Sequence, residues 1–183
     1  AMHRTADETV ALAQAAGRVL AADIASSITQ PPAAVSAMDG YAVNGADVHT
    51  APAVLKRVGE AAAGGSYDQV VQRGEAVRIF TGGTLPAGTD TVVLQENTVT
   101  DGDTVTVTHM TFKGRHVRER GLDFKEGDVL LRAGQHLGAR QIGLAAAMNV
   151  ATVSVRARPR VGVLATGNEL VDRKSTRLNS SHV

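Results

Sequence analysis

The sequence predicts a mixed α+β chain with more than one domain, and two observations carry this prediction. Apolar residues show helical spacing near both ends of the chain, whereas the middle consists of short β-rich runs that Gly, Asp and Asn interrupt. With 183 residues, 43% of them hydrophobic, the chain can bury the core of one ordinary domain or of two small ones. We therefore expect a β-rich module inserted between two helical segments that meet in space.

The first helical segment is expected over residues 11–22, where Leu12, Val19 and Leu20 are the larger apolar residues. Gly17 lies inside this stretch and costs a helix about 1 kcal/mol relative to alanine. We therefore expect a closely packed neighbour to require a glycine there.

The middle segment, residues 39–131, has the texture of a small β-barrel or sandwich. Its clearest feature is the pair Asp101-Gly102 between two Thr/Val runs, which indicates a β-hairpin with arms at 98–100 and 103–108. Further strands are expected at 55–60, 76–80, 91–95, 116–118 and 128–131.

Helical spacing returns at residues 137–148, and Asn149 suits the left-handed position that ends many helices. Residues 1–38 and 132–157 are accordingly expected to form two halves of one domain. The apolar run 160–165 then fits a buried parallel strand, at whose end ligands of α/β proteins bind.

The composition excludes several classes of protein. The chain has no cysteine, so it has no disulfide framework and no thiolate metal site, and its histidines lack the spacing of metal ligands. Aromatic residues make up only 3%, and the net charge of +1 depends on the last twelve residues, which contribute +2. Nucleic-acid binding is therefore not expected. No stretch is apolar enough to span a membrane, so we expect a cytoplasmic protein.

Asp39 is the first candidate for chemistry, within Ser36-Ala-Met-Asp-Gly-Tyr-Ala-Val43. Two prolines just upstream bar a helix here, so Asp39 should lie in a turn or at the start of a strand. Asp39 and Gly40 could be ordinary turn residues, with Gly40 supplying a positive φ. The turn Thr81-Gly-Gly-Thr84 follows an expected strand, however, and such a turn exposes N–H groups and hydroxyls that suit an anion.

These two segments, read with Arg118-Glu-Arg-Gly-Leu-Asp123 and with residues 160–170, resemble the molybdopterin molybdenumtransferase family. That family includes the homologous domain of the scaffold protein gephyrin. Four motifs in the family's order, spread from about Glu8 to Leu170, make the resemblance specific.

The resemblance implies an enzyme that inserts molybdate into adenylylated molybdopterin with release of AMP, with Mg²⁺ as cofactor. It implies a homodimer that acts on small molecules, without nucleic-acid or membrane partners. It further implies that residues 1–38 and 132–157 form an elongated α/β first domain, that residues 39–131 form an inserted β-barrel-like domain, and that residues 158–171 are the truncated start of an α/β molybdopterin-binding domain.

By motif match, Asp39, Thr81, Arg118, Asp123 and Glu169 fall on positions that the family uses at or near its active site. The resemblance gives catalytic roles to Asp39, Asp123 and Glu169, which would position metal or water or close the site, and substrate-binding roles to Thr81 and Arg118. Alternatives remain open. Arg118 and Asp123 could form a solvated salt bridge worth about 0–1 kcal/mol, and Glu169 could cap a helix.

Residues 172–183 resemble the translated read-through of a sequencing adapter, and we expect them to be foreign; a genuine polar tail is the alternative. The chain as given is then expected to be an inactive fragment of the enzyme. Two other functions remain open, a non-catalytic scaffold on the same fold and a generic β-barrel binding module. Retention of all five candidate residues favours the enzyme.

Overall fold

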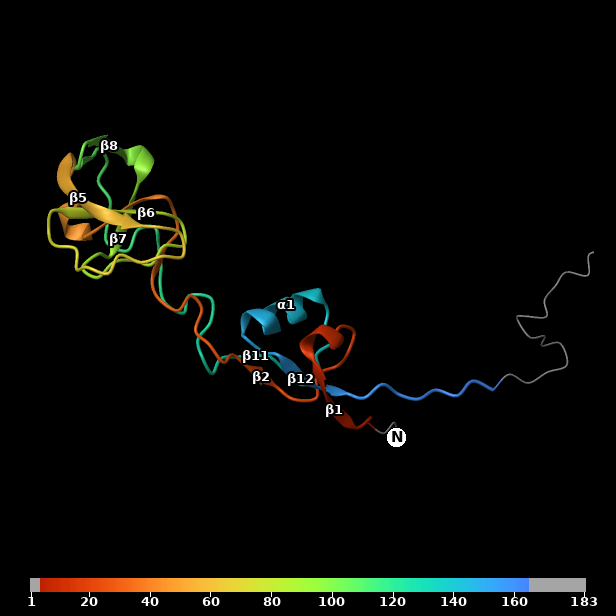
Figure 1. Cartoon of the computed structure of the whole chain (residues 1–183). Coiled ribbons are helices and arrows are strands. Elements are labelled where there is room, and N and C mark those ends of the chain that lie inside the picture. Colours follow the sequence, from red (N-terminus) through yellow and green to blue (C-terminus); the bar gives the residue numbers. More distant parts are fainter. Residues whose placement is uncertain (1–3, 165–183) are drawn as a thin grey trace, which may run out of the picture.

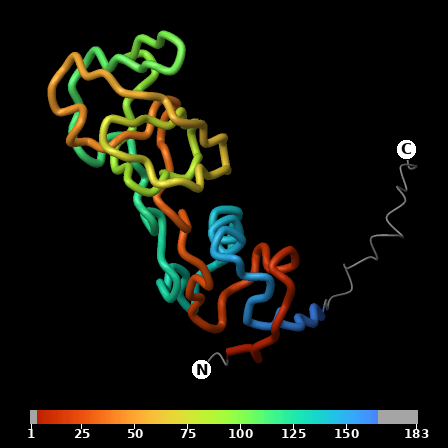
Figure 2. The backbone as a smooth tube through the Cα atoms, turned by 60° about the vertical axis from the view of Figure 1, so that its left-hand side comes forward, coloured from red at the N-terminus to blue at the C-terminus, as the bar shows by residue number. Residues whose placement is uncertain are grey.

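The computed structural model describes residues 4–164, which form two lobes joined by a narrow connector (Figures 1 and 2). The sheet lobe consists of residues 39–115, and the helix lobe of residues 4–28 and 124–157. The connector consists of residues 29–38 and 116–123. Within the described range the protein is mainly β with a single α-helix, so the expectation of a mixed α+β fold holds only in part.

One curled sheet of six strands builds the sheet lobe, in the order β7-β4-β6-β5-β9-β8. All neighbouring strands are antiparallel except β5 and β6, which are parallel. The bounds are β4 (Gly40–Val43), β5 (Ala53–Ala61), β6 (Glu75–Ile79), β7 (Thr91–Leu94), β8 (Thr98–Asp101) and β9 (Thr104–Val107). Two short 3₁₀ helices, η2 (Gly45–Asp47) and η3 (Gln95–Asn97), interrupt the connections.

The strands β4, β6 and β7 bury apolar side chains on both faces of the sheet, whereas β8 is mostly exposed. Along β4, Tyr41 and Val43 point into one cluster of buried side chains, whereas Ala42 points into a second cluster with Val77 and Ile79. This alternation is the two-residue period of a strand. The expected hairpin is confirmed, with Gly102 at a φ of 56° between β8 and β9, and the expected strands at 55–60, 76–80 and 91–95 are confirmed with it.

The helix lobe packs two small antiparallel sheets against one helix. β1 (Asp7–Ala11) pairs with β12 (Thr152–Arg156), and β2 (Ile24–Ala25) pairs with β11 (Val129–Leu131). The helix α1 (Ala139–Ala147) follows, and its core partners include Leu20, Leu137 and Val155. The helix expected at 137–148 is thus confirmed, and Asn149 ends it with a φ of 61°.

The helix expected over residues 11–22 is wrong. β1 ends at Ala11, and a single 3₁₀ turn, η1 (Leu12–Gln14), follows. Leu20 is instead fully buried in a bridge with Val155 of β12, so pairing with a distant strand overrides a weak local helix preference. Gly17 has a φ of +76°, and a Cβ added to it would have no neighbour within 4 Å, so the left-handed backbone requires this glycine, not a close neighbour.

The connector is a two-stranded antiparallel ladder. β3 (Val35–Ser36) pairs with β10 (Val117–Arg118), which reduces the strand expected at 116–118 to two residues. Towards the helix lobe the ladder continues through Gly121 N–H to Pro31 O at 2.9 Å and Asp123 N–H to Gln30 O at 3.0 Å. The strand expected at 128–131 is β11, which lies beyond the connector in the helix lobe.

Residues 160–164 do not form the expected parallel strand. Val163 is 89% exposed, and no described strand lies beside this segment to supply the hydrogen bonds that define a strand. Among the described residues, no helix is long and apolar enough to cross a membrane.

Candidate active site at the connector

Asp39 and Thr81 meet because they lie at adjoining ends of two paired strands. Gly40 of β4 is the partner of Ile79 of β6, so the residues just outside these strands face each other. Asp39 Oδ1 accepts hydrogen bonds from the N–H and from the Oγ1 hydroxyl of Thr81, both at 2.8 Å. Within residues 4–164 the second oxygen, Oδ2, has no hydrogen-bond donor, and the side chain is exposed.

This arrangement keeps Asp39 ionised. The N–H of Thr81 lowers the pKa of the Asp39 carboxyl most, and the Thr81 hydroxyl lowers it further. Desolvation raises this pKa by less, and the positive charge of Arg78 makes the smallest contribution, again lowering it. A carboxylate fixed through one oxygen, with the other facing solvent, can bind a cation or orient a water molecule.

Gly40 is required by space. A Cβ at this position would lie 1.9 Å from the carbonyl oxygen of Val93 on β7, an impossible contact. Gly40 is not among the glycines with positive φ, so the interpretation of Asp39-Gly40 as a turn that needs a left-handed glycine is wrong. β4 begins here, and its close approach to β7 excludes any side chain.

The Thr81-Gly-Gly-Thr84 turn does not offer its N–H groups to an anion, as the sequence suggested. The N–H of Thr81 binds Asp39, that of Gly82 binds Ser36 O at 2.9 Å, and that of Gly83 binds Phe80 O at 2.8 Å. The N–H of Thr84 binds Gly65 O at 3.0 Å. The turn therefore holds the carboxylate of Asp39, and contact of Thr81 with substrate stays a prediction.

Arg118 and Asp123 form an ion pair across the turn at Gly121. Arg118 Nη2 lies 2.9 Å from Oδ1 and 3.1 Å from Oδ2 of Asp123. Both side chains are almost half exposed, at 46% and 41%, so the pair contributes only about 0–1 kcal/mol to stability. Only one nitrogen of the guanidinium makes this contact, which leaves other N–H donors for an anion.

The segment just before Asp39 contacts both the turn that carries Thr81 and the strand that carries Arg118. Ser36 exchanges hydrogen bonds with Gly82 and Gly83 on one side and pairs with Val117 of β10 on the other. Ala37 N–H also binds His116 O at 2.9 Å. The structure thus brings the turn that carries Thr81 and the strand that carries Arg118 to opposite sides of one short segment. No described hydrogen bond or ion pair joins the Asp39–Thr81 pair to the Arg118–Asp123 pair directly.

Two residues near Asp39 were missed by the sequence analysis. Arg78 donates from Nη1 to Gly40 O at 2.9 Å and from Nη2 to Gln95 Oε1 at 2.5 Å. Gln95 N–H in turn binds Asp39 O at 3.3 Å. The only signal in the sequence is a lone arginine within the otherwise apolar strand 76–80.

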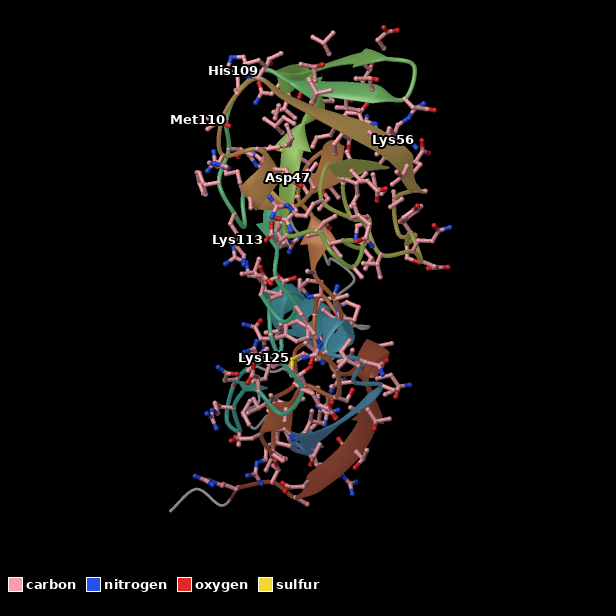
Figure 3. The ribbon with its side chains drawn as sticks, turned by 90° about the vertical axis from the view of Figure 1, so that its left-hand side faces the viewer. Asp47, Lys56, His109, Met110, Lys113 and Lys125 are labelled. Carbon is pink, nitrogen blue, oxygen red and sulfur yellow. The ribbon has the colours of Figure 1, made fainter. Side chains whose placement is uncertain are left out.

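Asp90 is a further acidic residue in the sheet lobe. It lies between Gly45, which follows β4, and Lys113, which precedes the connector. Asp90 Oδ1 accepts hydrogen bonds from Gly45 N–H at 2.7 Å and Thr91 Oγ1 at 2.8 Å. Lys113 Nζ lies 3.6 Å from Oδ2, and Figure 3 shows Lys113 at the end of the lobe that faces the connector. Asp90 therefore holds the loop that leads to β10, through Lys113 and through the bond from Gly114 N–H to Asp90 O.

The described carboxylates do not by themselves form a metal site, because no three His, Cys, Asp or Glu side chains within residues 4–164 lie close enough to hold an ion. Mg²⁺, however, is often bound through one or two carboxylates together with substrate phosphates. Asp39 Oδ2 fits that mode of binding. The remaining candidate, Glu169, lies outside the described residues.

The fold and the site define a two-lobed, mainly β module with an oriented carboxylate where the lobes join. Residues 1–149 match the family model described as the MoeA N-terminal region (domain I and II). The chain is 40% identical over 168 residues to the molybdopterin molybdenumtransferase of Nostoc sp. and 38% identical over 169 residues to that of Haemophilus influenzae. These alignments cover 90% and 92% of this chain but 38% and 42% of the relatives.

A solved structure agrees with this result. The molybdopterin biosynthesis moeA protein of Pyrococcus horikoshii OT3 superposes with a TM-score of 0.87 at 34% identity, over 93% of this chain and 46% of that protein. The chain belongs to the MoeA N-terminal region of the molybdopterin molybdenumtransferase family, which confirms the resemblance seen in the sequence. It spans about two fifths of the length of the curated relatives it matches.

Proposed function

We propose that this chain is the part of a cytoplasmic molybdopterin molybdenumtransferase that supplies an ionised carboxylate and a guanidinium to the reaction. That reaction inserts molybdate into adenylylated molybdopterin and releases AMP. The observation that carries the proposal is the geometry of Asp39, whose Oδ1 is held by two donors of Thr81 while Oδ2 faces solvent. A turn residue that merely closed its own backbone would bind locally, whereas Asp39 binds a residue 42 positions away.

The charges at the connector suit the chemistry of this reaction. Breaking the phosphoanhydride leaves AMP with a phosphate whose oxygens carry the developing negative charge, and molybdate is itself an oxyanion. The guanidinium of Arg118 has N–H donors outside its contact with Asp123, and such donors stabilise phosphate and oxyanions. Asp39 would position water or Mg²⁺, and Mg²⁺ when bound would neutralise charge on the phosphate oxygens.

The remaining parts of the proposal concern the whole protein. We assign residues 4–28 and 124–157 to the first domain, residues 39–115 to the inserted β domain, and residues 158–171 to the start of a molybdopterin-binding domain in which Glu169 closes the site. The boundary expected at residue 131 is moved, because β11 pairs with β2 and Leu131 packs in the core of the helix lobe. Asp123 would act beside Arg118. In the intact enzyme, a homodimer, the site would combine this β domain with the third domain of the partner subunit.

A chimera tests the function directly. Residues 4–157 of this chain would replace the corresponding part of the Haemophilus influenzae relative, to which the chain is 38% identical. We expect the chimera to release AMP from adenylylated molybdopterin only when molybdate is present, and to sediment as a dimer. The unmodified relative, assayed in parallel, is the positive control.

A chimera that is folded by circular dichroism but releases no AMP, while the unmodified relative does, would contradict the proposed function. It would instead favour the scaffold alternative. A folded, active monomer would contradict the homodimer alone.

A further inference from the structure

Arg78 lies at the centre of a small cluster on β6, beside Asp39. Its partner across the ladder is Tyr41 of β4, and residues directly opposite each other share one face of a sheet. The Arg78 guanidinium lies over the Tyr41 ring, 5.3 Å from its centroid, and over the Phe80 ring, 4.7 Å from its centroid. Both distances fall within the range of cation–π attraction, so two aromatic rings fix the plane of the guanidinium.

The fixed guanidinium contacts the backbone of Gly40 directly and reaches the backbone of Asp39 through Gln95. Nη1 donates to the carbonyl of Gly40, the next residue, at 2.9 Å. Nη2 donates to the side chain of Gln95 at 2.5 Å, and the N–H of Gln95 binds the carbonyl of Asp39 itself at 3.3 Å. A closed set of contacts therefore runs from Asp39 through Gly40, Arg78 and Gln95 back to Asp39.

We propose that Arg78 is a positioning residue for Asp39, fixing the backbone from which the carboxylate projects, so that Oδ2 faces the ligand or water that it binds. Thr81 holds the carboxylate from the side-chain end, and Arg78 with Gln95 holds it from the backbone end. The role of Asp39 itself rests on the proposed function. The mechanical relation between Arg78 and Asp39 does not.

The charge of Arg78 and the geometry of its contacts act on Asp39 separately, and two substitutions of Arg78 can distinguish them. Arg78→Gln removes both the charge and the two-point contact. Arg78→Lys keeps the charge but replaces a planar group by a single ammonium, which cannot hold Gly40 O and Gln95 Oε1 in the same arrangement. Arg78 also lowers the pKa of Asp39 through its charge, so titration of Asp39 reports the electrostatic part.

The experiment uses the 183-residue chain and nuclear magnetic resonance, with no molybdenum or nucleotide. The Asp39 carboxyl resonance, assigned with Asp39→Asn, gives its titration, and hydrogen exchange of the Thr81 N–H gives the integrity of its bond to Asp39. In Arg78→Gln we expect a raised pKa of Asp39 and Thr81 exchange faster by about two- to tenfold, the factor that corresponds to one hydrogen bond. In Arg78→Lys we expect faster Thr81 exchange with a pKa of Asp39 close to that of the unchanged chain.

The matched control lies in the other lobe. Arg132 Nη1 donates to Asp23 Oδ2 at 2.8 Å, and the N–H of Ala133, followed by the Arg132 side chain, lowers the pKa of Asp23. Arg132→Gln should raise the pKa of Asp23 and leave the titration of Asp39 and the exchange of Thr81 unchanged.

Two results would overturn the proposal. One is a folded Arg78→Gln chain with the original Asp39 titration and Thr81 exchange. The other is Arg78→Lys with the original Thr81 exchange, which would reduce Arg78 to a source of charge; this variant decides the matter if Arg78→Gln does not fold. An inactive chimera would count against the proposed function without touching these measurements, so the two failures can be told apart.

Discussion

Thr81 donates two hydrogen bonds, from its N–H and from its hydroxyl, to a single oxygen of Asp39, each at 2.8 Å. The contact exists because β4 and β6 run antiparallel and end together, with Gly40 opposite Ile79. Two donors on one oxygen favour the ionised form of a carboxyl group. Thr81 thus sets both the orientation and the charge of Asp39.

Asp39→Asn in the chimera should abolish most turnover while leaving the fold intact. Asparagine keeps an oxygen that can accept both hydrogen bonds from Thr81, but it carries no charge to hold a cation or orient water. We expect a loss of several kcal/mol of transition-state stabilisation, with the free energy of unfolding changed by less than about 1 kcal/mol, because the side chain is exposed. Molybdate-dependent AMP release and thermal unfolding, measured on the same variant, check this.

Asp103→Asn is the matched control for that substitution. Asp103 is also exposed and paired, with Arg57 at 3.1 Å, but it lies at the β8–β9 hairpin. Turnover should stay near normal in this variant. Near-normal turnover in Asp39→Asn as well would reduce Asp39 to a structural residue.

Gly40→Ala should destabilise the sheet lobe strongly, because the added Cβ would lie 1.9 Å from Val93 O, a backbone atom that cannot move without shifting β7. We expect a loss of at least about 2 kcal/mol in the free energy of unfolding. Gly143→Ala is the control, since Gly143 lies within α1 with nothing within 4 Å of the added Cβ. That variant should gain about 0.5–1 kcal/mol. Denaturant unfolding followed through the fluorescence of Tyr41 and Tyr67, both in the sheet lobe, and through helical circular dichroism separates the two lobes. A Gly40→Ala chain as stable as its parent would be incompatible with this packing.

Asp90 should make the sheet lobe sensitive to acid. Partial burial raises the pKa of Asp90, but hydrogen bonds from Gly45 and Thr91 and the charge of Lys113 outweigh it, so the pKa is lowered overall. The unfolded chain then binds more protons than the folded chain over this range. The stability that ionised Asp90 contributes is therefore complete above its unfolded pKa of about 4 and is lost as the pH falls through the lower folded value.

The measurement is the free energy of unfolding of the sheet lobe between pH 7 and pH 3, for the parent chain and for Asp90→Asn. The variant should be less stable at pH 7 and should lose less stability on acidification. Parallel curves for the two chains would show that Asp90 is not responsible for the acid sensitivity.

The strands were predictable from sequence where Thr and Val runs end at turn residues, as in the hairpin around Gly102, and α1 was predictable from its apolar stripe. The segment 11–22 was not. Its alanines and leucines satisfy a helical pattern, but the neighbouring β1 pairs with β12, near the other end of the described chain. Local propensity carries no information about a partner so distant.

The candidate site was likewise predictable only in part. Residue types and motif order single out Asp39, Thr81, Arg118 and Asp123, yet which residues touch depends on strand register. Register placed Arg78 opposite Tyr41 and so beside Asp39, a relation that no spacing in the sequence expresses. The turn after β6 shows the converse. Its sequence predicts N–H groups that are available to an anion, but in the fold the N–H groups of residues 81–84 are all bonded within the protein.

The last prediction separates a structural role for Arg118 from a role in binding substrate. Arg118→Asp places two carboxylates side by side at the connector, and adding Asp123→Arg restores an ion pair with its charges exchanged. Since both side chains are nearly half exposed, the doubly exchanged chain should unfold within about 1 kcal/mol of the parent. If Arg118 binds an anionic substrate, however, turnover of the exchanged chimera should remain as low as that of Arg118→Asp alone, because the guanidinium now projects from the wrong position. Recovery of AMP release on exchange would show that the ion pair itself was all that the site required of these two residues.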